Sequence, residues 1–321
     1  MHYGARAVGA VGAVGLITVE ASAVGPLHRT TSADLGIWNE EQAAAHRRLT
    51  SCIRERGTVP GIQLQAAGRK GSHQLPWVGA GQNGPVSAAD GGWPTFGPSA
   101  VPFGDLNVPR EADHADHADI DEIVEAFTRA TRMAHLAGYQ VVEIQAAHGY
   151  LLHEFLSPLS NHRTDEYGGS PHNRMRLALR VARAVRAAFP ADKAVFVRIT
   201  TTDWVEGGIS VDEAVMFAKE LAAVGIDLID VTSGLVVRDE AARPPRGGTG
   251  STSSSRRRSG TRRDSRSPRS DRSTICRWPV TRSVRSGPVP PGRQPARRST
   301  QHAARSFSHG PVRGSGRVGR R

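Results

Sequence analysis

A short polar loop after an apolar run carries the residues of this chain that are best suited to chemistry. Gln145, His148 and Tyr150 lie within six residues, directly after the apolar run VVEI at 141–144. They supply two hydrogen-bonding side chains and a phenol, which are groups that can hold the polar part of a small substrate. This loop is therefore the first candidate for an active site.

The elements on either side of the loop predict how it is positioned. The run at 141–144 predicts a strand. A helix is predicted after Ser170, which can cap it, with Pro171 at the first helical position. Strand, polar loop and helix form the unit of an α/β barrel, whose catalytic residues lie on the loops that leave the strand ends on one face.

The same unit recurs along the chain up to about residue 240. Between the apolar runs lie helical patterns. Asp119 and Glu122 predict a capping box before a helix at 120–136, and Ser210 and Glu213 predict another capping box. Near-continuous apolar runs are typical of parallel strands that are covered on both faces. The five runs are Val14–Val19, Gly61–Leu64, Gln140–Ile144, Ala194–Ile199 and Asp227–Val231.

These patterns predict an α/β fold of the TIM (β/α)8-barrel type, incomplete, with about five of the eight βα units. A doubly wound sheet is less consistent with the sequence, because no GxGxxG follows the first strand. A barrel aldolase remains an alternative, but none of the three lysines, Lys70, Lys193 and Lys219, lies at the end of a predicted strand.

Two other patterns have structural explanations. The small and apolar N-terminal residues, with Ala21-Ser22-Ala23 after them, imitate a signal peptide, but GLITVE at 15–20 predicts a buried strand. The repeat ADHADHAD at 112–119 contains metal-ligand residue types, and we interpret it as a solvated helix start.

No apolar run reaches the length of a membrane span. Cys52 and Cys276 have no zinc or disulfide spacing, which favours a cytoplasmic protein.

The composition changes abruptly after residue 242. Residues 243–321 contain 21 arginines, no lysine and two acids, whereas the rest of the chain has 21 basic and 28 acidic residues. The segment 243–321 lacks apolar periodicity, so we expect a disordered tail rich in Arg, Ser, Gly and Pro, joined to a barrel domain at 1–242. Binding of RNA or another polyanion by this tail is an alternative function. A shifted reading frame would also explain the change.

Seven stretches carry a further signal, in order along the chain: GLITVEASAV (15–24), DLGIW (34–38), GIQL with AGRK (61–70), GPSAVPF (97–103), AAHGYLLHEFLSPLSNHRTDEYGGSP (146–171), FVRIT (196–200) and LIDVTSG (228–234). Together they resemble the Old Yellow Enzyme family, and in particular its YqjM-like ene-reductases. The resemblance covers about residues 2–236 and is most specific in the long stretch that follows the predicted strand at 141–144.

The resemblance implies an FMN-dependent oxidoreductase that takes hydride from NADH or NADPH and passes it to the activated alkene of an enone-like substrate. It also implies that Gln145 and His148 hold the substrate carbonyl and that Tyr150 delivers the proton. A small-molecule substrate is therefore expected, with no specific nucleic acid and no membrane, and family members can form homo-oligomers.

The resemblance assigns flavin binding to Gln63, Arg198 and the backbone at Ala21. Gln145 departs from the histidine that is usual in the family, which implies weaker polarisation of the carbonyl. The family's first strand and its last two, which carry the phosphate cradle, have no counterpart in this sequence. We therefore expect weak flavin binding by the chain as written, and an incomplete barrel.

Overall fold

The computed structural model describes residues 3, 14–78, 84–112 and 118–238. The chain divides into two compact units, Met1–Val280 and Thr281–Arg321, and the second lies outside the described residues. The strands are β1 (Leu16–Ala23), β2 (Val59–Gln65), β3 (Phe96–Gly97), β4 (Arg110–Glu111), β5 (Val141–Ala146), β6 (Ala194–Thr200) and β7 (Leu228–Thr232). The α-helices are α2 (Glu40–Arg54), α3 (Ala118–Leu136), α4 (Leu151–Leu156), α5 (Pro171–Ala188) and α6 (Val211–Ala223), and the 3-10 helices are η1 (Pro26–His28), η2 (Gly68–Lys70) and η4 (Ala88–Asp90).

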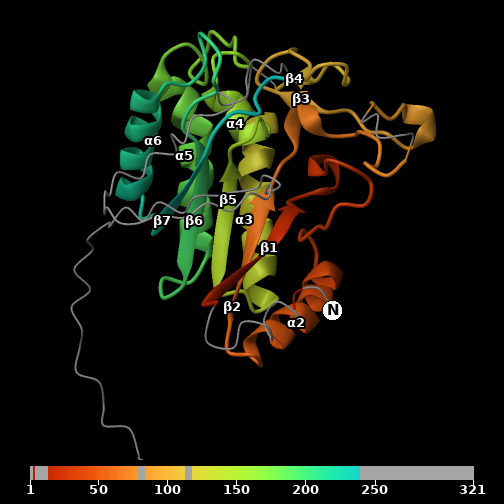
Figure 1. Ribbon diagram of the computed structural model, residues 1–321, viewed down its shortest axis with the longest axis vertical. Helices are drawn as coiled ribbons and strands as arrows, with labels where there is room; N and C mark the ends of the chain where they lie inside the picture. Colours follow the sequence, from red (N-terminus) through yellow and green to blue (C-terminus); the bar gives the residue numbers. More distant parts are fainter. Residues whose placement is uncertain (1–2, 4–13, 79–83, 113–117, 239–321) are drawn as a thin grey trace, which may run out of the picture. The chain divides into compact units, whose positions relative to one another are not determined.

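Five parallel strands form the main sheet, in the order β1-β2-β5-β6-β7 (Figure 1). Strand order follows chain order, as in an α/β barrel. Every predicted apolar run overlaps one of these strands, and β5 is buried along its whole length. The predicted parallel α/β fold is therefore confirmed. The strand interpretation of residues 15–20 is also confirmed, because β1 extends through them to Ala23.

The helices α2, α3, α5 and α6 pack against one another in chain order, so each lies beside the next helix along the sheet (Figure 1). The residues of α3 explain this packing. Ile120, Ile123, Phe127, Ala130 and Ala134 recur at helical spacing and are all fully buried. They form one apolar face that contributes to the main core.

The helix starts follow local capping chemistry. Ser210 and Glu213 form the predicted capping box of α6: the Ser210 hydroxyl accepts from the Glu213 amide at 3.3 Å, and the Glu213 carboxylate accepts from the Ser210 amide at 3.0 Å. Ser170 caps α5 as predicted. The prediction for Asp119 is wrong, because α3 already includes this residue and its carboxylate is bound by the guanidinium of Arg110 at 2.6 Å.

Several predictions fall outside the described residues. They are the domain boundary at 242, the basic tail at 243–321 and residues 113–117 of the histidine–aspartate repeat. Within the described ranges, no helix is both long enough and apolar enough to cross a membrane. The same ranges contain no group of three or more His, Cys, Asp or Glu residues that could hold a metal ion.

Candidate active site

The C-terminal ends of the central strands bring most of the predicted site residues together. Gln63 lies on β2, Gln145 on β5 and Arg198 on β6, and His148 lies in the loop that follows β5. Gln145 is directly opposite Arg198 in the sheet register, and Arg198 is opposite Asp230 of β7. Parallel strands place their carboxyl ends at one edge, which explains why residues far apart in the sequence meet here.

Gln145 and His148 lie side by side. The Gln145 amide nitrogen is 3.4 Å from His148 Nδ1 and donates to Gln63 Oε1 at 3.2 Å. His148 Nε2 is 2.9 Å from the hydroxyl oxygen of Thr232 on β7. The amide oxygen of Gln145 is buried and has no hydrogen-bond partner within the described part of the chain. This orphaned acceptor indicates a position at which a bound molecule could donate.

A strained turn holds His148 in place. Its φ is 59°, in the left-handed region that residues other than glycine seldom occupy. The His148 amide donates to the Thr200 hydroxyl at 3.0 Å, and its carbonyl accepts from the Lys70 ammonium at 2.6 Å. The next residue, Gly149, also has a positive φ, and a Cβ there would lie 2.5 Å from the carbonyl oxygen of Leu235. The turn therefore requires glycine at 149 and fixes the imidazole at 148.

A buried histidine and a buried aspartate support the same turn. His153, on α4, accepts from the Gly149 amide at its Nδ1, at 2.7 Å. Its Nε2 lies 3.1 Å from the carboxylate of Asp203, and both side chains are fully buried. Because Nδ1 accepts a hydrogen bond, the imidazole carries its proton on Nε2, which faces the Asp203 carboxylate. The loop after β6, which contains Asp203, thus fixes the loop after β5.

His148 is held in its neutral form. Burial is the largest cause, and the positive charges of Arg198 and Lys70 add to it, so that the pKa of His148 is lowered to about 3. With Nδ1 facing the amide hydrogens of Gln145, Nε2 carries the single imidazole proton toward Thr232. The pair therefore contains N–H donors but no cationic histidine, and here these donors face Gln63, His148 Nδ1 and Thr232.

Tyr150 stands at the position before α4, and its phenol is half-buried. Burial raises its pKa, so the hydroxyl keeps its proton at neutral pH. The Lys70 ammonium lies 5.3 Å from the centre of its ring. The hydroxyl forms no hydrogen bond with another described residue, so the structure does not couple Tyr150 directly to Gln145 and His148.

Two acids beside the predicted flavin-binding residues were missed by the sequence reasoning. Glu143 accepts from the Gln63 amide at 2.5 Å, and Asp230 lies 3.2 Å from Arg198 Nε. Burial raises the pKa of Glu143, and the hydrogen bond from Gln63 partly opposes this shift. A signal for both acids was present in the sequence, since each interrupts an otherwise apolar strand, VVEI or LIDV.

Ala21 lies on β1 within an irregularity, where the register against β2 shifts between Val19 and Ser22. A shift of this kind turns the backbone away from regular pairing with the neighbouring strand. The flavin-binding roles of Ala21, Gln63 and Arg198 and the substrate roles of Gln145, His148 and Tyr150 remain predictions.

Lys70 is a further residue that the sequence reasoning did not place in the site. Its ammonium donates to the carbonyls of His148 and Leu235, at 2.6 and 2.7 Å, and lies 4.0 Å from the centre of the Phe103 ring. Burial, followed by the charge of Arg69, lowers the pKa of Lys70 to about 7. Lys70 thus ties the His148 turn to the segment after β7.

The lowered pKa of Lys70 predicts a pH dependence of stability. Between about pH 7 and pH 10 the unfolded chain binds a proton at Lys70 that the folded chain has lost, so the free energy of unfolding should rise by about 1 kcal/mol per pH unit. Lys70→Met should remove this component. Urea unfolding of both proteins at several pH values measures it, and equal slopes would contradict it.

The fold and this site define a class of protein: the barrel-type α/β proteins whose polar groups gather at the carboxyl ends of their parallel strands. The sequence model of the NADH:flavin oxidoreductase / NADH oxidase family matches residues 1–267. The chain belongs to this family. Its resemblance to the Old Yellow Enzymes is thereby confirmed.

Curated relatives and solved structures agree with this assignment. The NADPH dehydrogenase of Bacillus subtilis (strain 168) is 42% identical over 236 residues, and that of Geobacillus sp. (strain WCH70) is 44% identical over 238 residues. Each alignment covers 74% of this chain and 62% of the relative, so the chain spans less than two thirds of their length.

Two solved structures show the same architecture. The old yellow enzyme homologue from Zymomonas mobilis has a TM-score of 0.59 at 25% identity, covering 72% of this chain and 63% of that chain. Morphinone reductase in complex with tetrahydroNAD has a TM-score of 0.58 at 29% identity, covering 71% and 62%.

Proposed function

We propose that this chain belongs to an FMN-dependent NADPH dehydrogenase of the ene-reductase type, which reduces the activated alkene of an enone-like substrate. The observation that carries the proposal is the contact of Gln145 with His148 at 3.4 Å, beside Gln63 of β2 and opposite Arg198 of β6. The name of the relatives supports NADPH as the reductant.

The residues at the carboxyl ends of β2, β5 and β6 are suited to a flavin ring. Arg198 uses Nε toward Asp230, and its two terminal nitrogens form no hydrogen bond with any described residue. A guanidinium with free terminal donors can bind the oxygen-bearing edge of a flavin and stabilise negative charge there. Gln63 supplies an amide beside it, and the half-buried backbone at Ala21 borders the sheet on the side of β1.

When bound, FMN would supply the hydride that NADPH delivers and the alkene accepts. The role of Gln145 and His148 is to hold the substrate carbonyl with N–H donors, so that the negative charge that develops on its oxygen is stabilised. The protonated phenol of Tyr150 is the group in this loop that can give up a proton to the other alkene carbon.

Titration of the full chain with FMN, followed by flavin fluorescence, tests cofactor binding. Arg198→Met removes a charge-assisted hydrogen bond, and such bonds contribute about 1.5–3 kcal/mol, so the FMN dissociation constant should rise about tenfold or more. Arg198→Lys keeps the charge beside Asp230 and should have a smaller effect. Arg183→Met, at an exposed position of α5, is the matched control. A flavin affinity that is the same for Arg198→Met and Arg183→Met would refute the assignment.

The departure at Gln145 yields a second prediction. Histidine is the usual hydrogen-bond donor to the substrate carbonyl at this position in the family. Gln145→His should therefore raise the rate of enone reduction by about tenfold, which is less than the full contribution of one oxyanion donor. The measurement is NADPH oxidation that depends on 2-cyclohexenone, without oxygen. A rate that is unchanged or lower would show that residue 145 does not contact the carbonyl.

A further inference from the structure

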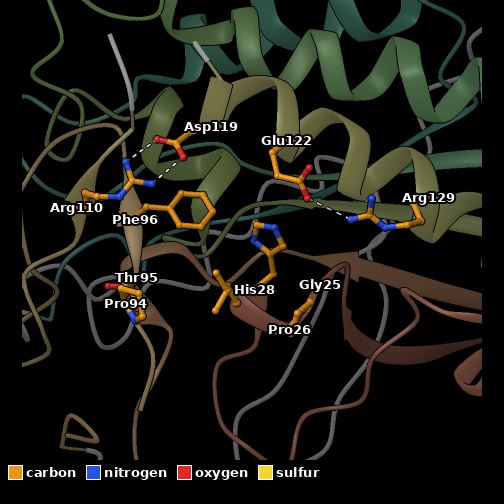
Figure 2. A pocket seen from close by; sticks show the side chains of 11 residues that line it. Gly25, Pro26, His28, Pro94, Thr95, Phe96, Arg110, Asp119, Glu122 and Arg129 are labelled. Atoms are coloured by element: carbon orange, nitrogen blue, oxygen red, sulfur yellow. Dashed lines mark hydrogen bonds and ion pairs between the residues drawn. The ribbon is translucent and has the colours of Figure 1, made fainter. Parts of the chain in front are cut away.

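A pocket lies between η1, the strand β3 and the helix α3 (Figure 2). It shares no residue with the candidate active site. Its volume is about 210 Å³. An engineered apolar cavity of about 150 Å³ is enough to hold benzene, so this pocket has room for one substituted six-membered ring. Pro26 and Phe96 supply apolar walls.

His28 stands in the middle of this pocket with its ring between Phe96 and Glu122 (Figure 2). It is only 5% exposed, and its Nδ1 is buried without a hydrogen-bond partner. Neither ring nitrogen forms a hydrogen bond with a described residue. The ring makes an edge-on contact with Phe96, with 5.4 Å between the ring centres.

The other buried histidines of the described residues differ from His28 in this respect. His46 Nδ1 lies 2.7 Å from the Tyr139 hydroxyl oxygen, and His153 Nδ1 accepts from the Gly149 amide at 2.7 Å while its Nε2 faces the Asp203 carboxylate at 3.1 Å. A buried polar group without a partner is costly and calls for a specific explanation, such as a bound molecule. His28 therefore has a donor and an acceptor available for a ligand.

The charges around His28 cancel. Arg110 is bound by Asp119 at 2.6 and 2.7 Å, and Arg129 pairs with Glu122 at 3.2 Å (Figure 2). Burial and the charge of Arg129 lower the pKa of His28 to about 4, so the imidazole is neutral at pH 7. An anion would face two carboxylates and a cation would face two guanidinium groups. The pocket thus favours an uncharged occupant.

We propose that this pocket is a second ligand site, which binds an uncharged single-ring molecule through a hydroxyl group hydrogen-bonded to the imidazole of His28. A hydroxyl can both donate and accept, so it complements a neutral imidazole in either tautomer. The ring of the ligand would pack against Phe96 and Pro26. This site is independent of the proposed reductase activity, since it uses none of the residues assigned to it.

Phenol is the probe for this site, and NMR of the full chain labelled with 15N-histidine is the measurement. Phenol should shift the ring nitrogen signals of His28 in a saturable way, with a dissociation constant of about 1 mM, as expected for a ligand of this size. The signals of His46, which already has a partner, serve as an internal reference. Benzoate and benzylammonium, which carry charges, should bind at least about tenfold more weakly.

Two variants separate this site from others that phenol could occupy. His28→Phe retains a ring beside Phe96 but removes the hydrogen bond, and it should weaken phenol binding about tenfold while the melting temperature stays equal or rises. His148→Ala should leave the response of His28 to phenol unchanged. The proposal is overturned if phenol leaves the His28 signals unchanged, if benzoate binds equally well, or if His28→Phe binds phenol like the original chain. It is also overturned if His28→Phe melts at a clearly lower temperature, because the imidazole would then contribute to the stability of the fold.

Discussion

Replacing Asp203 by alanine is expected to lower the free energy of unfolding by about 3–5 kcal/mol, because hydrogen bonds to a buried charged group contribute about 1.5–3 kcal/mol each. Asp203 is fully buried and accepts hydrogen bonds from the Ser157 hydroxyl at 2.7 Å and the Ile209 amide at 2.9 Å, and His153 Nε2 lies 3.1 Å from its carboxylate. Without the carboxylate, these groups would be left in the interior without an acceptor. Urea unfolding followed by circular dichroism measures the loss.

The pH dependence distinguishes this explanation from a simple loss of packing. Burial acts to raise the pKa of Asp203, but the bonds and charge from His153, with the Ile209 amide and the Ser157 hydroxyl, outweigh it and leave the pKa below its usual value. A lowered carboxyl pKa contributes stability that is present above about pH 4 and is lost as the pH falls through the pKa of the folded state. The difference between the original chain and Asp203→Ala should therefore shrink in acid.

Asp192→Ala is the matched control. Asp192 is exposed in the turn after α5, so its loss should change the free energy of unfolding by no more than about 0.5 kcal/mol. A loss for Asp203→Ala as small as that of the control would mean that the contacts of Asp203 do not contribute to the stability of the fold.

His148→Ala is expected to reduce kcat/KM for enone reduction by about 10²–10³, the range measured when one oxyanion donor is removed. The side chain stands at a strained turn, next to Gln145 and to the Thr232 hydroxyl, and it makes no contact that the core requires. The free energy of unfolding should therefore change little. Steady-state oxidation of NADPH with 2-cyclohexenone, together with FMN titration, separates lost turnover from lost flavin.

The control for this variant is His172→Ala. His172 is exposed in the first turn of α5, and its removal should leave both turnover and flavin binding as they are. Equal activity of His148→Ala and His172→Ala would exclude His148 from the reaction, whatever the flavin content. Loss of flavin from His148→Ala with unchanged turnover per bound flavin would assign it to cofactor binding.

The strands and most helices could be predicted from the sequence because their causes are local. Apolar runs such as VVEI before the loop at 145–150 are buried wherever parallel strands pair, and Ser210 with Glu213 caps a helix through contacts three residues apart. The family motif identified Gln145 and His148 as neighbours in space, because Gln145 lies at the end of β5 and His148 comes three residues later, in the loop that follows it.

The sequence could not predict which residues from other strands contact the site residues. Thr232 and Lys70 meet the His148 loop, and Asp230 meets Arg198, only because β2, β5, β6 and β7 end at one edge of the sheet. The neutral state of His148 also depends on burial and on charges brought from two other elements.

The chain's residue types and spacings thus determined the parallel α/β architecture and the location of the candidate chemistry. The tertiary structure alone decided which groups are charged, paired or left without a partner, His28 among them. The physical reason is that hydrogen bonding and desolvation depend on distances between segments that are far apart in sequence, and no local pattern encodes those distances.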